Sequence, residues 1–229
     1  MDNLAPHLQS FDVTLSAVEG HRWCIDWLRG LDRRFSSVLN AGCNIGHETI
    51  SLLWLLGAAN AIGIDIDAQV IRQANDRIEA LVEDIRQLRG AIDRKIPMPA
   101  FMEERVLSLL KDYGHLALPT YRVADITKDI DLPTSSYDLV YCHKVLYLLA
   151  CPTDTQSSRA TALSAIRDLA DLLITEGLFV AIEPLTCSPD DTTSVDLSEL
   201  FSAAGLRQLH DCESLVGIEE RRVYCYEKT

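Results

Sequence analysis

The sequence alternates short apolar runs of β-strand character with longer amphipathic segments, and this alternation constrains the fold more than any other feature. It is typical of a mostly parallel sheet that is covered by helices on both faces. We therefore predict an α/β fold, a three-layer sandwich around a seven-stranded sheet. The predicted strands are residues 37–41, 61–65, 121–124, 137–142, 178–183, 206–211 and 222–227.

The length and composition of the chain bound the number of domains. A chain of 229 residues can bury one large core, so we expect a single domain over residues 1–229. Hydrophobic residues make up 48% and charged residues 24% of the chain, a balance that is typical of a packed globular domain. Extended disorder is therefore not expected.

The net charge argues against nucleic acid as a partner. A formal net charge of −13 gives no attraction to a phosphate backbone. The nearest basic candidates, Arg33-Arg34 and Arg221-Arg222, are only pairs, which favours ordinary solvated charges.

Neither secretion nor a membrane is indicated. The first six residues carry no basic flank followed by an apolar run. The longest uncharged stretch, residues 49–64, is shorter than the roughly 18 to 20 residues that span a bilayer, and glycines interrupt it. A cytoplasmic protein is the simplest expectation.

The cysteines and histidines show no metal-binding pattern. The seven cysteines include no Cys-x-x-Cys pair, so neither zinc nor a redox dithiol is indicated. The six histidines form no His-x-x-x-His or His-Glu-x-x-His arrangement. We expect reduced core thiols and no metal.

A long helical stretch lies between the second and third predicted strands. It begins after Asp67, which can cap a helix N-terminus. Spacings of three and four place six apolar residues on one stripe: Ile71, Ala74, Ile78, Leu81, Ile85 and Leu88. A second helical segment follows the break at residues 97–99. Because an ordinary crossover is far shorter, residues 86–118 are predicted to be a helical insertion, either a lid or a passive packing extension.

The strongest sign of a ligand site is a glycine turn that joins a strand to a helix within residues 37–48 (SVLNAGCNIGHE). Gly42 and Gly46 let the backbone turn tightly and approach a ligand without a Cβ atom in the way. The second strand ends in Asp65, about 20 positions further on, the spacing at which a carboxylate can bind the two hydroxyls of a ribose.

Five motifs in order make the sequence resemble the class I (Rossmann-like) S-adenosylmethionine-dependent methyltransferase family, from about Phe35 to Cys225. They are the glycine turn, the acidic end of strand two, and residues 124–126 (ADI), 136–143 (SYDLVYCH) and 173–184 (LITEGLFVAIEP). The last of these motifs, residues 173–184, resembles the family's helix, glycine turn and fifth strand. The resemblance implies an antiparallel last strand and S-adenosylmethionine as cofactor.

The resemblance also implies the residues that bind the cofactor. The methionine part would lie against the first-strand loop, at Ala41, Gly42, Asn44 and Gly46. Asp65 would bind the ribose, Ile66 would pack on the adenine, Asp125 and Ile126 would read the adenine amino group, and Cys142 would pass beside the sulfonium.

The sequence departs from the family pattern at two positions. An acidic residue is usual where Asn40 stands, and a glycine is more common where Asn44 stands; an amide still donates and accepts hydrogen bonds. A nicotinamide-dependent dehydrogenase is the competing interpretation of the turn. Its Gly-x-Gly-x-x-Gly fingerprint lacks a third glycine here, and Asp125 would have no role in it.

Methyl transfer expels a neutral leaving group, so positioning does most of the work. An alcohol, phenol or ammonium acceptor also needs a base or an exit path for its proton. The candidates are His143 and Tyr147 after the fourth strand and Glu183 at the end of the fifth. Each has a structural alternative: a packed imidazole, a core aromatic ring and a carboxylate that caps the following loop. The polar loop at residues 188–194 also follows the fifth strand, where such sheets bind ligands.

Residues 1–34 are expected to form a helical cap, a segment that often closes the pocket in the family. Four of its residues could cover the cofactor or pack in the core: Phe11, His21, Trp23 and Trp27. The compact size favours a small-molecule acceptor that is methylated on O, N, S or C. Residues 42–48 and 141–148 also resemble chemotaxis-receptor glutamate methyltransferases, so a protein acceptor is the alternative, and a non-catalytic partner module is another. The acceptor and the oligomeric state stay open.

Overall fold

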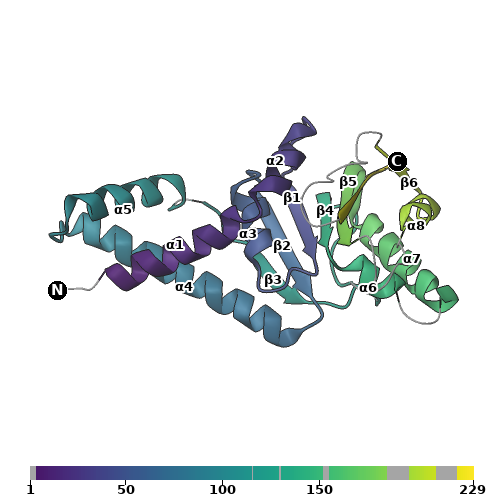
Figure 1. Cartoon of the computed structure of the whole chain (residues 1–229), viewed down its shortest axis with the longest axis horizontal. Coiled ribbons are helices and arrows are strands. Elements are labelled where there is room, and N and C mark those ends of the chain that lie inside the picture. Colours follow the sequence, from purple (N-terminus) through teal and green to yellow (C-terminus); the bar gives the residue numbers. More distant parts are fainter. Residues whose placement is uncertain (1–3, 115, 129, 152–154, 185–195, 210–220) are drawn as a thin grey trace.

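The computed structural model describes residues 4–114, 116–128, 130–151, 155–184, 196–209 and 221–229. In these residues, seven strands form one sheet in the order β3-β2-β1-β4-β5-β7-β6 (Figure 1). The strands are β1 Ser37–Ala41, β2 Asn60–Asp65, β3 Thr120–Val123, β4 Tyr137–His143, β5 Leu173–Pro184, β6 Leu206–Gln208 and β7 Arg221–Lys228. Strands β1 to β5 are parallel to one another, and β7 is antiparallel to both β5 and β6. The predicted seven-stranded sheet with an antiparallel last strand is confirmed.

Helices cover both faces of the sheet (Figure 1). They are α1 Ala5–Glu19, α2 Arg22–Gly30, α3 His47–Trp54, α4 Ala68–Asp93, α5 Ala100–Asp112, α6 Leu146–Ala150, α7 Thr155–Asp171 and α8 Ser198–Ala203. Alternate strand residues belong to different cores, because successive side chains of a strand point to opposite faces. In β4, Leu139 and Tyr141 pack with α1, α2 and α3, whereas Val140 and Cys142 pack with α6, α7 and α8. The three-layer prediction is therefore confirmed.

The fifth strand is longer than its motif suggested. Residues 173–176 were expected to end a helix and turn, but they belong to β5, and Leu173 pairs with Tyr137 across an irregularity in the register. A short apolar run is compatible with either a helix end or a strand, so only the pairing with β4 decides. β6 ends at Gln208, and the last two residues of the predicted strand 206–211 lie outside the described residues.

The long helix α4 begins where predicted. The Asp67 side chain caps it by accepting hydrogen bonds from the backbone N–H groups of Gln69 at 2.7 Å and Val70 at 3.4 Å. The predicted stripe faces inward, with Ile71, Ala74, Leu81 and Leu88 buried and Ile78 and Ile85 partly buried. Helices α1, α4 and α5 pack together as an arm that extends to one side of the sheet (Figure 1).

Four of the cysteines agree with the expectation of reduced core thiols, since Cys24, Cys43, Cys142 and Cys225 are free and buried. Burial raises the pKa of the Cys24 and Cys43 thiols to about 12. Cys151 is disulfide-bonded, so the expectation is wrong at this position. A disulfide depends on the distance between two Cα atoms in the fold, which sequence spacing does not report. Among the helices of the described residues, none is both long and apolar enough to cross a bilayer.

Candidate active site

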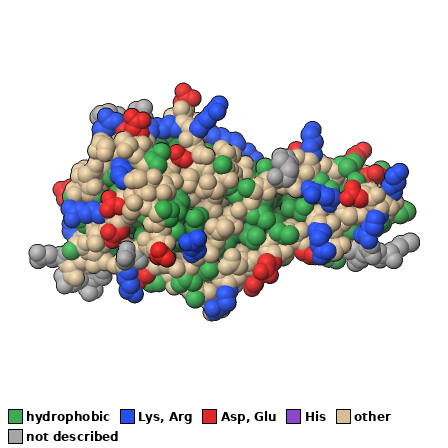
Figure 2. Space-filling view, turned by 180° about the vertical axis from the view of Figure 1, so that it is seen from behind, with side chains coloured by type: hydrophobic (Ala, Val, Ile, Leu, Met, Phe, Trp, Pro, Cys, Tyr) green, Lys and Arg blue, Asp and Glu red, His purple; other side chains and the backbone are tan. Residues whose placement is uncertain are grey.

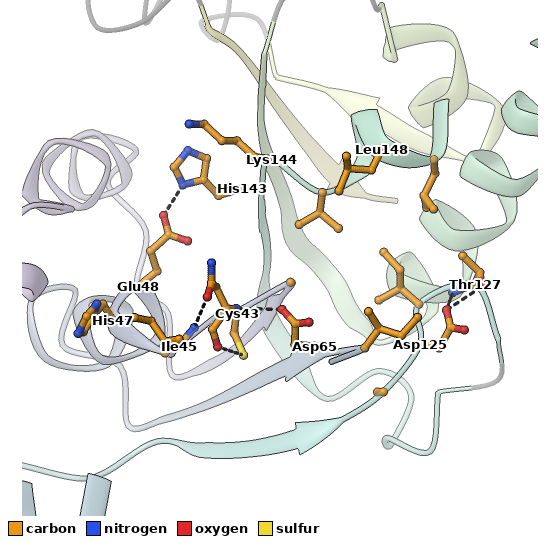
Figure 3. Close-up of a pocket in the computed structure, with 18 of the residues that line it drawn as sticks. Cys43, Ile45, His47, Glu48, Asp65, Asp125, Thr127, His143, Lys144 and Leu148 are labelled. Carbon is orange, nitrogen blue, oxygen red and sulfur yellow. Dashed lines mark hydrogen bonds and ion pairs between the residues drawn. The ribbon is translucent and has the colours of Figure 1, made fainter. Parts of the chain in front are cut away.

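A cavity of about 700 Å³ lies at the carboxyl ends of β1, β2 and β4 (Figure 3). Seven of the predicted cofactor-binding residues line it: Gly42, Asn44, Gly46, Asp65, Ile66, Asp125 and Ile126. Ala41 and Cys142 are fully buried and do not line it. In sheets of this kind, ligands bind outside the carboxyl ends of the strands. The cavity is therefore the candidate active site.

The glycine turn needs its glycines for two reasons. Gly42 and Gly46 have φ angles of +74° and +90°, which side chains rarely adopt. A Cβ atom on Gly42 would lie 2.2 Å from Val145 Cγ2, and one on Gly46 would lie 2.5 Å from the Tyr121 hydroxyl. Each glycine therefore lines the cavity while a neighbouring side chain, Val145 or Tyr121, occupies the place where a Cβ atom would lie.

Asn44 occupies the position where the family more often has a glycine, and its conformation explains why it is tolerated. Its φ is +48°, in the left-handed region that asparagine adopts more readily than most residues. Its side-chain oxygen accepts a hydrogen bond of 2.7 Å from the backbone N–H of Ile45. Asn40 lies below the turn, fully buried, and its amide donates to the Thr49 hydroxyl of α3 at 3.0 Å.

The carboxylates Asp65 and Asp125 both line the cavity, and in Figure 3 Asp65 lies between Glu48 and Asp125. Asp65 accepts hydrogen bonds of 3.0 Å from the backbone N–H groups of both Asn44 and Asp67. Asp125 accepts from the Thr127 hydroxyl at 2.7 Å, and Lys128 lies 2.9 Å from its second oxygen. Hydrogen bonds from Thr127 and Lys128 lower the pKa of Asp125 to about 2, so this carboxyl is ionised at neutral pH.

A second polar cluster lies at the far side of the cavity from Asp125 and joins α3, β4, β7 and the turn between α1 and α2. One oxygen of Glu48 accepts from Nδ1 of His143, and Nδ1 of His21 lies 3.1 Å from the same oxygen (Figure 3 labels Glu48 and His143). Nη1 of Arg221 lies 2.7 Å from Nε2 of His143. Burial raises the pKa of Glu48, but the hydrogen bonds from His143 and His21 outweigh it and lower the pKa to about 2.

Sequence reasoning singled out His143 but gave no role to Glu48 or Arg221. Residues 21, 48, 143 and 221 are far apart in the chain, and no spacing pattern links them. Three of these residues could together hold a metal ion. The possible ligand atoms of His21, Glu48 and His143 lie within 4.8 Å of one another. The expectation of no metal stays a prediction.

The other two predicted catalytic residues lie away from the cavity lining. Glu183 is buried, and it accepts from the backbone N–H groups of Val145 at 3.2 Å, Leu146 at 2.9 Å and Tyr147 at 3.4 Å. Tyr147 is half-buried on α6. In the structure, Glu183 therefore holds the start of α6 against β5.

The buried carboxyl of Glu183 should make the stability of the protein depend on pH. Burial raises its pKa from 4.5 to about 7, although the three backbone hydrogen bonds act in the other direction. Because the folded-state pKa is raised, Glu183 favours folding below pH 4.5, and this contribution is lost as the pH rises through about 7. Glu183→Gln lacks the ionisable group and serves as the reference. Relative to this variant, we expect the free energy of unfolding of the wild type to fall by about 3 kcal/mol from pH 4.5 to pH 8. Urea unfolding of both proteins across this range measures it, and parallel curves would contradict it.

Of the four cap residues that could cover the cofactor or pack in the core, His21 lines the cavity. The Trp23 ring meets the His143 ring edge-on at 6.4 Å, whereas Phe11 packs on Tyr113 at 6.2 Å and Trp27 packs against the core. No described residue of the insertion 86–118 lines the cavity, so a lid role stays a prediction. The polar loop 188–194 lies outside the described residues.

Three of the four arginines in the basic pairs named in the sequence contact other residues of the protein. Arg33 pairs with Glu227, Arg221 contacts His143, and Arg222 lies 3.1 Å from Asp196. On the face seen in Figure 2, acidic and basic side chains are interspersed, and hydrophobic side chains gather near the middle. This face therefore carries no basic stripe of the kind that tracks a phosphate backbone.

The strand order and the position of the cavity define the fold as that of the class I (Rossmann-like) S-adenosylmethionine-dependent methyltransferases. A methyltransferase from Clostridium acetobutylicum is similar with a TM-score of 0.58 and 11% identity, over 90% of this chain and 89% of that chain. The N-methyltransferase NodS from Bradyrhizobium japonicum has a TM-score of 0.55 and 13% identity over 92% and 96% of the two chains. A TehB-like methyltransferase from Corynebacterium glutamicum has a TM-score of 0.55 and 16% identity over 90% and 86%. The predicted fold is confirmed.

Similarity to curated proteins is local. Ribosomal protein L11 methyltransferases, including those of Citrobacter koseri and Salmonella newport, are 48% identical over 56 residues, which is 24% of this chain. The match spans about a fifth of the length of those relatives, 19%. No protein-family model matches the sequence.

Proposed function

We propose that the chain is an S-adenosylmethionine-dependent methyltransferase that acts on a small molecule. The observation that carries the proposal is the convergence of the turn at Gly42 to Gly46, Asp65 and Asp125 on one cavity, although they come from three separate segments. Bound S-adenosylmethionine would supply a methyl group on a sulfonium, which is transferred to a nucleophilic O, N, S or C atom of the acceptor.

The chemistry of the cavity fits this cofactor. Asp65 offers carboxylate oxygens to the ribose hydroxyls, and ionised Asp125, with Ile126 beside it, offers an acceptor to the adenine amino group. Ile66 is 67% exposed at the cavity wall, where an adenine ring would cover it. The methionine part would lie against Gly42, Asn44 and Gly46. Ala41 and Cys142, whose side chains are buried, would contribute only backbone.

The volume of the cavity, about 700 Å³, lies within the range of roughly 300 to 1,000 Å³ that is typical of small-ligand pockets, which fits the cofactor. The compact size of the chain, 229 residues, supports a small acceptor as the first candidate. The local identity to ribosomal protein L11 methyltransferases supports a protein acceptor as the second candidate. A partner module without catalysis is the third.

Two measurements test the proposal. We expect calorimetric titration to show binding of both S-adenosylmethionine and S-adenosylhomocysteine, and we expect methyl-labelled cofactor, incubated with a cell extract, to label small molecules. Label recovered in proteins instead would favour the second candidate. Absence of binding at millimolar cofactor would overturn both enzyme functions.

A further inference from the structure

We propose that His21, held in place by Glu48, is the general base that takes the proton from the methyl acceptor. The inference rests on the proposed function and adds a catalytic residue from the N-terminal cap. It also names the acceptor class: a group that must lose a proton, such as an alcohol, a phenol or an ammonium.

The geometry gives His21 the features of a base. It lines the cavity, and its side chain is 27% exposed. Its Nδ1 lies 3.1 Å from the Glu48 carboxylate, which only accepts hydrogen bonds when ionised, so the proton of neutral His21 is on Nδ1. Nε2 has no hydrogen-bond partner among the described residues, and its lone pair is available to an acceptor.

The neighbouring His143 lacks a free nitrogen. A guanidinium only donates hydrogen bonds, so Arg221 at 2.7 Å requires Nε2 of His143 to accept. Its proton is then on Nδ1 and is donated to Glu48. Both ring nitrogens are occupied, and taking up another proton would break the contact with Arg221. His143 and Arg221 are positioning residues, which hold Glu48 where it can orient His21.

The proton balance of the step is simple. The proton of the acceptor moves to Nε2 of His21, during methyl transfer for a hydroxyl and before it for an ammonium, which has no lone pair until that proton leaves. The electron pair of the acceptor atom then forms the bond to the methyl carbon, and the carbon–sulfur bond breaks with its electron pair on sulfur. The sulfur product is a neutral thioether. Protonated His21 is stabilised by the Glu48 carboxylate and then returns its proton to water.

The same contacts argue against a metal ion in this cluster. Coordination by Nδ1 of His143 would move the ring proton to Nε2, where it would face the N–H groups of Arg221. Such a site would leave two donors opposed at 2.7 Å. In the metal-free arrangement a donor faces an acceptor at each of the three contacts, His143 to Glu48, His21 to Glu48 and Arg221 to His143.

Diethyl pyrocarbonate tests the arrangement without any substrate, because it acylates an imidazole nitrogen that has a free lone pair. His7 is a matched control: its Nδ1 lies 2.9 Å from Asp84, and its side chain is 32% exposed. We expect peptide mass spectrometry to show His7 and His21 modified at least tenfold faster than His143. We expect Arg221→Ala to make His143 reactive. Protection of His21 while His7 reacts, or equal modification of His21 and His143, would overturn the proposal.

Turnover gives the second arm, on an acceptor found by the labelling experiment. We expect His21→Ala to lower kcat at least 100-fold with unchanged S-adenosylhomocysteine binding, and added imidazole to restore part of it. His7→Ala should retain wild-type turnover. Full activity of His21→Ala, or activation of the wild type by Mn²⁺ or Zn²⁺, would overturn the role of His21. If the wild type binds the cofactor but His21→Ala keeps full activity, only the role of His21 is wrong. If the wild type does not bind the cofactor, the proposed function itself is wrong.

Discussion

Asp65→Ala is expected to weaken S-adenosylmethionine binding at least 100-fold, which corresponds to about 2.7 kcal/mol. The carboxylate has two tasks. It would accept the ribose hydroxyls, and it already accepts 3.0 Å hydrogen bonds from the backbone N–H groups of Asn44 and Asp67. Removing it therefore takes away a contact to the ligand and also loosens the turn that would hold the methionine part. Calorimetric titration measures the loss.

Two variants control this measurement. Asp65→Asn keeps one carbonyl acceptor and the shape of the side chain, so we expect an intermediate loss. Asp76→Ala removes an exposed carboxylate from α4, the helix that follows β2, and should bind as the wild type does. If Asp65→Ala binds the cofactor with unchanged affinity, the ribose does not lie at the end of β2, and the assignment of the cavity is wrong.

Gly42→Ala is expected to lower the free energy of unfolding by about 3 kcal/mol. A non-glycine residue at φ +74° costs roughly 1 to 2 kcal/mol, and forcing an extra methyl group into a packed site costs about 1 to 3 kcal/mol. The methyl group would lie 2.2 Å from Val145 Cγ2, at the start of α6. Urea unfolding, followed by circular dichroism, measures the change.

The chain offers a matched control that separates strain from overlap. Gly57 has a φ of +80°, and no atom lies within 4 Å of the place of its Cβ, so Gly57→Ala should show the strain alone. Adding Val145→Ala to Gly42→Ala should recover part of the loss, because it removes the overlapping side chain. Equal destabilisation of Gly42→Ala and Gly57→Ala would show that overlap with Val145 plays no part.

Much of the fold could be predicted because local patterns report local geometry. The stripe that begins at Ile71 and the cap at Asp67 were enough to place α4, and strand β1 matches its predicted bounds. The start of β5 could not be predicted in this way. Leu173 is compatible with a helix end or a strand, and its pairing with Tyr137 decides between them.

The cofactor end of the site was also within reach of the sequence. Asp65 ends a strand and Asp125 follows one, and the carboxyl ends of neighbouring parallel strands meet at one edge of a sheet. The acceptor end was only partly within reach: the sequence singled out His143 and His21, but it gave no role to Glu48 or Arg221. Glu183 ends a strand too, yet it is buried and satisfies three backbone N–H groups of α6 instead of facing the cavity.

The sequence by itself therefore determined the elements, their alternation and the turn at Gly42 to Gly46, because periodicity and backbone preference act between residues that are close in the chain. Only the tertiary structure decided that His21, Glu48, His143 and Arg221 meet. Which distant donor satisfies a given acceptor depends on how the helices pack on the sheet, and that packing also decides which histidine nitrogen stays free.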